Sequence, residues 1–304
     1  MRARSLTAAM LAGLVLVCGA TAGSERKPPR VIKTLRTGGS PIGITAALGS
    51  IWVANFGGDD VVRINPQRNR ISARIPVESP YAVAFGAGSI WVTSVEGDSV
   101  ARIDPATNTV VARIRVGVQQ AGLAVSGGDV WVANFGARDV ARIDAATNTV
   151  TARIPVHGNS EDVAFAAGSA WVPTEDNVVE RIDPATNKII ATIRVGADPD
   201  TAVFCRGRLW ASSLLGTRLY AIDVRRNAVA ARIRVGLGSE GLACAGRILW
   251  VANFGTGYLL KVDLVRRRVV RRVSVGIQPR QVLLANRSLW VTNQGSGTVS
   301  RIRP

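Results

Sequence analysis

Residues 81–116 read YAVAFGAGSIWVTSVEGDSVARIDPATNTVVARIRV, four strand-like runs separated by short polar loops. In the last run, every second residue is apolar, which is the period expected of a β-strand: Val110, Ala112, Ile114 and Val116. The run around Trp91 does not alternate, which is typical of a strand buried on both faces. Asp-Pro-Ala-Thr-Asn at 104–108 favours a type I turn between the third and fourth runs.

This pattern recurs along the chain, and each copy carries one tryptophan that lies 39 or 40 residues from the next. The tryptophans are Trp52, Trp91, Trp131, Trp171, Trp210, Trp250 and Trp290. A repeat of about 40 residues with four strands is typical of a β-propeller blade. The sequence therefore predicts an all-β, seven-bladed β-propeller with four-stranded blades.

The last repeat stops at Pro304, where the third strand of the other repeats ends. Residues 30–38 resemble the fourth run of the other repeats. We expect this N-terminal strand to complete blade seven, which closes the ring and removes an exposed edge. The propeller then forms one domain over residues 30–304.

The N-terminus has the features of a secretory signal peptide: Arg2 and Arg4, an apolar stretch at 11–17 and small residues at 20–22. We expect a signal peptide at 1–22 and a short linker at 23–29. A lipoprotein would use Cys18, but the bulky Val17 before it disfavours that alternative. No other segment has the ~20 apolar residues that span a bilayer. The prediction is an exported monomer, periplasmic or extracellular.

Two cysteines remain after the predicted cleavage, Cys205 and Cys244, at matching places in blades five and six. An exported compartment permits a disulfide between them, but neighbouring blades can also hold the pair too far apart for bonding. The sequence leaves both states open and favours two buried thiols. Neither cysteine has the spacing of a metal or redox motif.

The formal net charge of +17 is concentrated in the last third of the chain. Residues 201–304 contain 18 Lys and Arg against 3 Asp and Glu, whereas residues 1–200 contain 20 against 18. Loops that join strands one to two and three to four emerge on one face of a propeller, here named the bottom face. In blades five to seven these loops contain nine arginines: Arg206, Arg208, Arg225, Arg226, Arg247, Arg266, Arg267, Arg268 and Arg287.

Arginine binds phosphate with two parallel hydrogen bonds, so this arginine-rich sector predicts a partner such as nucleic acid or an anionic cell-envelope polymer. Solubility is the simpler alternative, since arginine outnumbers lysine 34 to 4 throughout the chain.

On the opposite, top face, the loop entering each first strand places one side chain near the channel mouth. These residues are Ile42, Tyr81, Ala121, Glu161, Asp200, Glu240 and Arg280. The three carboxylates, with Asp162 and His157 in the adjoining loop, are ligand or metal candidates, because Ca²⁺ and Mg²⁺ prefer oxygen ligands. Solvated loop acids explain the same residues, and no other cofactor is expected.

The recurring motifs Gly-Ser-Ile-Trp-Val-x-Asn, Val-x-Arg-Ile-Asp-Pro-x-Thr-Asn-x-Val and Arg-Ile-x-Val-Gly resemble the YVTN-type β-propeller repeat family, including exported YncE-like proteins, over residues 30–304. The resemblance implies a periplasmic protein with possible DNA binding. It is specific for the fold and not for a function, because the repeated residues are those of the blade architecture.

The Gly-x-x-Pro and Trp-Val pattern is also similar to virginiamycin B lyase, a seven-bladed enzyme that opens a cyclic lactone with histidines, a glutamate and Mg²⁺. The single histidine, His157, provides no pair of histidines for such acid–base chemistry. We therefore predict a non-catalytic binding or scaffold protein, with the metal-dependent lyase as the alternative and a protein partner as a further one.

Overall fold

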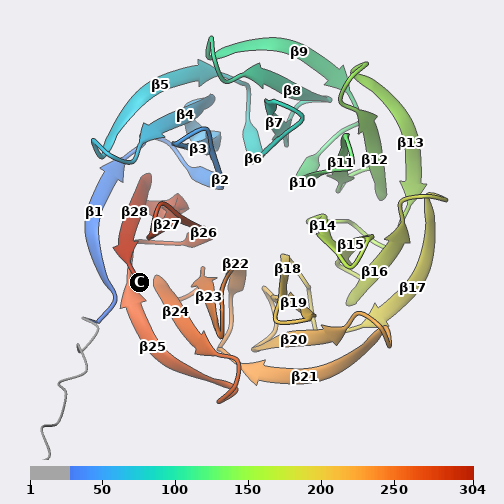
Figure 1. Cartoon of the computed structure of the whole chain (residues 1–304), viewed down its shortest axis with the longest axis vertical. Helices are drawn as coiled ribbons and strands as arrows, with labels where there is room; N and C mark the ends of the chain where they lie inside the picture. The colour runs from blue at the N-terminus through green and yellow to red at the C-terminus, as the bar shows by residue number, and fades with distance from the viewer. Residues whose placement is uncertain (1–27) are drawn as a thin grey trace, which may run out of the picture.

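The computed structural model describes residues 28–304, which form seven four-stranded antiparallel sheets arranged as blades around a central axis (Figure 1). The predicted signal peptide and most of the predicted linker lie outside the described residues. Within residues 28–304, no helix is long and apolar enough to cross a membrane. The prediction of an all-β, seven-bladed propeller is confirmed.

The first four blades follow one another from the second strand of the chain onward. Blade one contains β2 (Pro41–Ala47), β3 (Ser50–Asn55), β4 (Asp60–Asn65) and β5 (Arg70–Pro76), with the 3₁₀ turn η1 (Phe56–Gly58). Blade two contains β6 (Pro80–Gly86), β7 (Ser89–Ser94), β8 (Ser99–Asp104) and β9 (Thr109–Arg115). Blade three contains β10 (Gln120–Ser126), β11 (Asp129–Asn134), β12 (Asp139–Asp144) and β13 (Thr149–Pro155). Blade four contains β14 (Ala164–Ala166), β15 (Ser169–Thr174), β16 (Val178–Asp183) and β17 (Lys188–Arg194).

The last three blades complete the ring. Blade five contains β18 (Ala202–Cys205), β19 (Arg208–Ala211), β20 (Arg218–Asp223) and β21 (Ala228–Arg234). Blade six contains β22 (Ser239–Ala245), β23 (Ile248–Asn253), β24 (Tyr258–Asp263) and β25 (Arg268–Ser274). Blade seven contains β26 (Pro279–Ala285), β27 (Ser288–Asn293), β28 (Thr298–Arg303) and β1 (Arg30–Arg36), with the 3₁₀ turn η2 (Gln294–Ser296).

The N-terminal strand closes the ring as predicted. β1 pairs antiparallel with β28 and is the outermost strand of blade seven, with Arg36 opposite Thr298. Just beyond the strand, the Thr37 hydroxyl donates a hydrogen bond to the carbonyl of Gly297 at 3.1 Å. Both ends of the propeller chain are therefore held in one sheet, as the two adjoining colours at the left of Figure 1 show.

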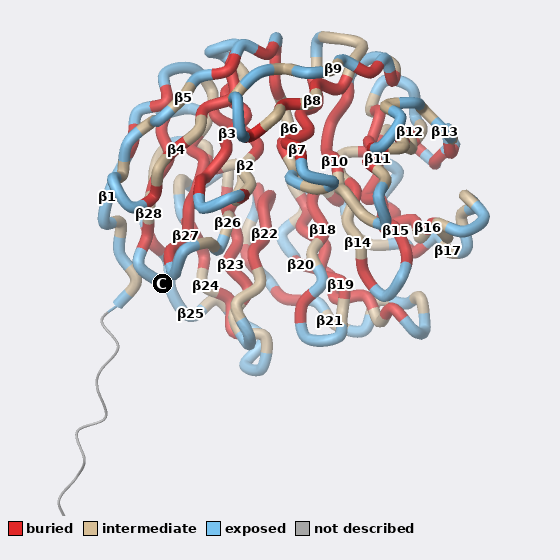
Figure 2. Tube along the Cα trace, turned by 45° about the horizontal axis from the view of Figure 1, so that its top comes forward, coloured by how far each residue is buried: buried red, intermediate tan, exposed pale blue. Residues whose placement is uncertain are grey.

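The core lies between the blades and is supplied by the inner strands (Figure 2). β3, β7, β15 and β27 are buried along their whole length, whereas the outer strands β5, β9, β13, β17 and β21 alternate between exposed and less exposed residues. The tryptophans are at most 4% exposed, so each is a core residue. A turn forms at the predicted place: the Asp104 carboxylate accepts from the Ala106 amide at 2.8 Å, the Asp104 carbonyl accepts from the Asn108 amide at 2.9 Å, and Asn108 has φ of 58°.

An arginine on the third strand joins each of five blades to the next, an arrangement we name the arginine clip. In blade two, Arg102 donates from Nη1 to the carbonyl of Ala145 at 2.8 Å and to Asn148 Oδ1 at 2.9 Å, both in the turn of blade three. Its Nε donates to Ser89 Oγ at 2.9 Å, and its guanidinium lies 5.0 Å from the Trp91 ring centroid. The same contacts to the next blade recur at Arg63, Arg142, Arg181 and Arg301.

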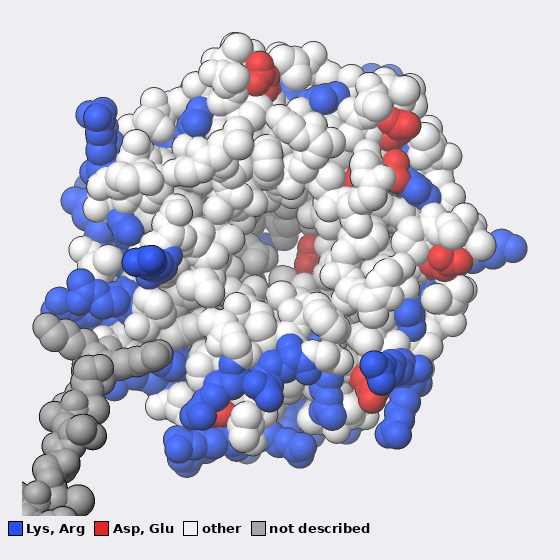
Figure 3. Space-filling view, viewed as in Figure 1, with Lys and Arg blue, Asp and Glu red and all other residues white. Residues whose placement is uncertain are grey.

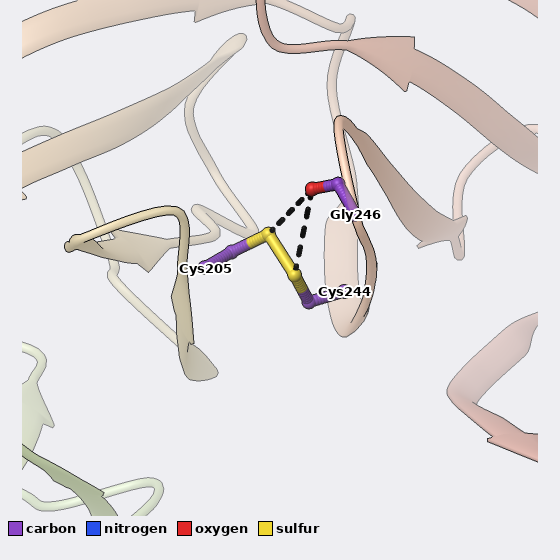
Figure 4. The surroundings of a disulfide bond; sticks show 3 residues. All are labelled: Cys205, Cys244 and Gly246. Carbon is purple, nitrogen blue, oxygen red and sulfur yellow. Dashed lines mark hydrogen bonds between the residues drawn. A yellow bond between two sulfur atoms is a disulfide. The ribbon is translucent and has the colours of Figure 1, made fainter.

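The joint between blades five and six has no arginine clip, because Ala221 faces Trp210 where five other blades place arginine. A disulfide between Cys205 and Cys244 joins these two blades instead (Figure 4). The Cα atoms are 5.6 Å apart, within the range that a disulfide requires. The preference for two buried thiols is therefore wrong: the first strands of neighbouring blades come close enough at this point.

Candidate functional site

A cavity of about 160 Å³ lies in the central channel and is lined mainly by the first strands and the segments that precede them. Of the seven channel positions predicted from the repeat, five line this cavity: Ile42, Tyr81, Glu161, Asp200 and Arg280. Asp162, Thr201 and Gln281 lie beside them. The first strands of blades four and five, β14 and β18, are shorter than those of the other blades, so their carboxylates stand on irregular backbone at the channel.

Arg280 is the one guanidinium of this cavity, and its hydrogen bonds cross the channel. Nη1 donates to Glu240 Oε1 at 2.7 Å, and Nη2 donates to the Tyr81 hydroxyl at 2.7 Å. The side chains of Arg280 and Glu240 are 15% and 1% exposed, so this ion pair is shielded from solvent. Arg280 also lies 5.6 Å from the ring of Phe254. Blades two, six and seven are thereby connected through a single side chain.

The carboxyls around Arg280 outnumber it, which changes their acidity. Burial raises the pKa of Glu161 to about 8 and that of Glu240 to about 9, and the neighbouring Asp200 adds to both shifts. Burial also raises the pKa of Asp162 to about 7 and raises that of Asp200. Like charges this close cannot all ionise, so near neutral pH the cluster retains protons.

His157 does not join these carboxyls. Its Nδ1 is hydrogen-bonded to the Glu180 carboxylate, and its backbone amide donates to the same carboxylate at 3.0 Å. This bond with Glu180 raises the pKa of the imidazole, whose side chain is 67% exposed. Within residues 28–304, no group of three His, Cys, Asp or Glu side chains is placed to hold a metal ion. A Ca²⁺ or Mg²⁺ site stays a prediction.

Glu180 is a buried carboxylate that the sequence analysis missed. It stands in β16 at the position of Ala101 in β8 and Ala141 in β12, and it is fully buried. The sequence did carry a signal for Glu180: it is an acidic residue at an apolar strand position, and the only histidine lies in a nearby loop. The Glu180 carboxyl oxygens are hydrogen-bonded to the His157 ring and backbone amide and to the Thr192 hydroxyl at 3.4 Å.

The nine arginines of the bottom loops gather in blades five to seven, and Figure 3 shows Lys and Arg crowding the lower and left parts of the ring, where these blades and β1 lie. All except the half-buried Arg208 are exposed. Only two form salt bridges, Arg247 at 2.9 Å and Arg266 at 4.0 Å, and both use the single carboxylate of Asp263. The other seven have no salt bridge with the described part of the chain. The structure thus brings together a dense group of cationic side chains with little internal neutralisation.

Comparison with known proteins supports the fold. No family model matches the chain, and no curated protein matches it, so the resemblance to YVTN-type repeats stays a prediction. Among solved structures, the chain is similar to a chain of Kuenenia stuttgartiensis hydrazine synthase, with a TM-score of 0.78 and 18% identity over 87% of this chain and 96% of that chain. At this identity the likeness concerns the propeller architecture alone, which hosts many functions.

Proposed function

We propose that this protein is an exported, non-catalytic binding protein that uses the bottom face of blades five to seven to bind a phosphodiester polyanion, such as nucleic acid or a teichoic-acid-type envelope polymer. The observation that supports this function best is the contrast in how arginine is used. In five joints the strand-three arginine donates to neutral acceptors in the next blade, whereas seven bottom-loop arginines of blades five to seven have no salt bridge with any residue of 28–304. Unneutralised arginines suit phosphate oxygens, which accept from both guanidinium nitrogens.

Export is supported by the disulfide. Disulfides persist in oxidising compartments and are rare in the reducing cytosol, and the Cys205–Cys244 bond joins two blades here. For an exported protein, the accessible polyanions are envelope polymers and extracellular nucleic acid. The cellular location is tested by fractionating cells that express the full chain and following the protein by immunoblot.

The binding proposal is tested by titrating protein that begins at residue 28 against fluorescent oligothymidylate and poly(glycerol phosphate) across a salt series. Replacing Arg266, Arg267 and Arg268 by alanine removes up to three phosphate contacts, so we expect the slope of log K against log salt to fall by about 2. The matched control removes the same charge elsewhere, at the exposed outer-strand residues Arg113, Arg115 and Arg194. If both triple variants weaken binding equally, the effect comes from net charge alone. That result would contradict binding by the bottom face of blades five to seven.

A second candidate function is ligand binding in the channel cavity. It is favoured by the surplus of carboxyls over the single Arg280 around that cavity, which suits a small cation. The lyase alternative lacks comparable support, because His157 is bonded to Glu180 and does not line the cavity. Calorimetry with Ca²⁺ and Mg²⁺ tests the metal form of this candidate, and binding must be lost on Glu161→Gln with Asp200→Asn.

A further inference from the structure

A second pocket, of about 240 Å³, lies on the bottom face at the joint of blades five and six, which has no arginine clip. It is lined by residues of blades five and six: Arg206, Arg208, Trp210, Ala231, Leu264, Val265 and Arg267. In five other joints, this place is filled by the strand-three arginine that one blade extends to the turn of the next. The lining of the pocket combines three arginines with Trp210 and three aliphatic residues, and the indole Nε1 of Trp210 is buried without a hydrogen-bond partner in the described part of the chain.

The substitutions at this joint are chemically coordinated. In blade two, the clip needs a guanidinium from Arg102 and side-chain acceptors from Ser89 and, in the next blade, Asn148. At the joint of blades five and six, Ala221 replaces the arginine. Arg208, two residues before the tryptophan as Ser89 is, replaces the serine.

The asparagine of the clip is replaced as well. Arg267 holds the turn position of Asn148 and adopts the same left-handed backbone, with φ of 53° against 58°. The acceptors of a regular joint have therefore become donors, and the cation between them is gone. Such a joint no longer suits a guanidinium and instead suits an anion that carries several acceptor oxygens.

The nearby carboxylates, Asp263 and Asp223, form no salt bridge with the three arginines of this pocket within residues 28–304. Asp263 forms its salt bridges with Arg247 and Arg266, outside the pocket lining. Asp223 accepts from the backbone amides of Arg225 and Arg226, which lowers its pKa, and the charges of Arg226 and Arg208 contribute less. Arg206, Arg208 and Arg267 have no salt bridge with the described residues, so all three guanidiniums of the pocket remain available.

We propose that this pocket binds one phosphate group, held by Arg206, Arg208 and Arg267 beside Trp210. The proposal rests on the proposed function, since it places one phosphate of the polymer within the arginine-rich face. A free phosphate ion offers the same chemistry, so the two sources are separated by experiment. The disulfide between Cys205 and Cys244 holds the two blades together beside the pocket, where the clip would otherwise do so.

The test restores the clip without changing the net charge, by combining Ala221→Arg with Arg267→Asn. The new guanidinium occupies the pocket, and the new asparagine supplies its acceptor. The control, Ala228→Arg with Arg234→Asn, exchanges the same charges at two exposed positions of β21 that lie outside the pocket lining and outside the nine bottom-loop arginines. Inorganic phosphate and oligothymidylate are each titrated by calorimetry. A second variant, Arg208→Ser, removes one donor and leaves Ala221 in place, and circular dichroism checks that each variant is folded.

We expect inorganic phosphate to bind the wild type and the control alike, and to bind the clip variant and Arg208→Ser at least about tenfold more weakly. Phosphate binding that is absent in the wild type, or unchanged in the clip variant, overturns the pocket. If oligothymidylate still binds in that case, the proposed function stands without the pocket. Phosphate binding that is lost in the clip variant, with no oligothymidylate binding to any variant, supports the pocket and contradicts nucleic acid as the polymer of the proposed function.

Discussion

The joints between blades two and three and between blades five and six do the same mechanical task with different chemistry. In the first, Arg102 donates to a carbonyl and an asparagine of the next blade and lies over Trp91. In the second, a disulfide joins the blades, and the clip positions hold Ala221, Arg208 and Arg267. Because the covalent bond secures the joint, the serine and asparagine positions of the clip do not have to accept from a guanidinium. They hold Arg208 and Arg267 instead. In a repeat protein, one of several equivalent joints can thus carry an arginine-lined pocket in place of the clip.

The largest effect on this comparison is expected from removing the covalent link. The disulfide closes a loop with a sequence separation of 39, for which the chain-entropy model gives about 4 kcal/mol of stability. Cys205→Ser with Cys244→Ser should lower the free energy of unfolding by roughly this amount, as measured by urea denaturation. Reduction of the wild type is the matched control, and an unchanged midpoint in both would show that the disulfide does not secure the joint.

The next largest effect is expected from removing one clip. Arg102→Ala leaves the partly buried Asn148 and the Ala145 carbonyl without their donor, at a cost of about 2–3 kcal/mol in the free energy of unfolding. Arg113→Ala removes the same charge from the exposed face of the outer strand β9 and should change stability by less than about 0.5 kcal/mol. Equal losses from the two variants would mean that charge, and not the clip, stabilises the blades.

The smallest effect on stability is expected in the acidic channel, and it differs from the effects at the two joints because it depends on pH. Because burial raises the pKa of Glu161 to about 8, the folded protein keeps a proton that the unfolded chain releases above its ordinary pKa of 4.5. This contribution to stability is complete below about pH 4.5 and is lost as the pH rises through about 8. Glu161→Gln should flatten that decline and stabilise the protein at pH 8, with little change at pH 4.5.

Thermal unfolding of wild type and Glu161→Gln across this pH range measures the difference. Arg113→Ala serves as the comparison because its position is remote from the channel lining. Parallel pH profiles for wild type and Glu161→Gln would show that the carboxyl is not held protonated in the channel.

Sequence periodicity was sufficient for the architecture because each blade repeats the same local pattern. The tryptophan spacing predicted the blades, and the partial repeats at 30–38 and 300–304 predicted the ring closure. The channel residues were also predictable, since the top loops place equivalent positions around one axis.

Contacts between blades were harder to predict because their partners lie about 40 residues apart in sequence. The arginine of the repeat was visible, but its acceptors lie in the turn of the next blade, as with Arg102 and Asn148. The Cys205–Cys244 distance and the His157–Glu180 pair depend in the same way on the packing of separate segments. A linear scan places these residues on elements without giving their separation in space.

The most direct test of the account is amide hydrogen exchange of the wild-type protein with and without bound oligothymidylate at low salt. If the bottom face binds the polymer, we expect protection in the bottom loops of blades five and six, at residues 206–208 and 264–268. Exchange in the equivalent turns of blades two to four should be unchanged. Protection centred on the channel residues around Glu161 and Arg280, or spread equally over all blades, would contradict it.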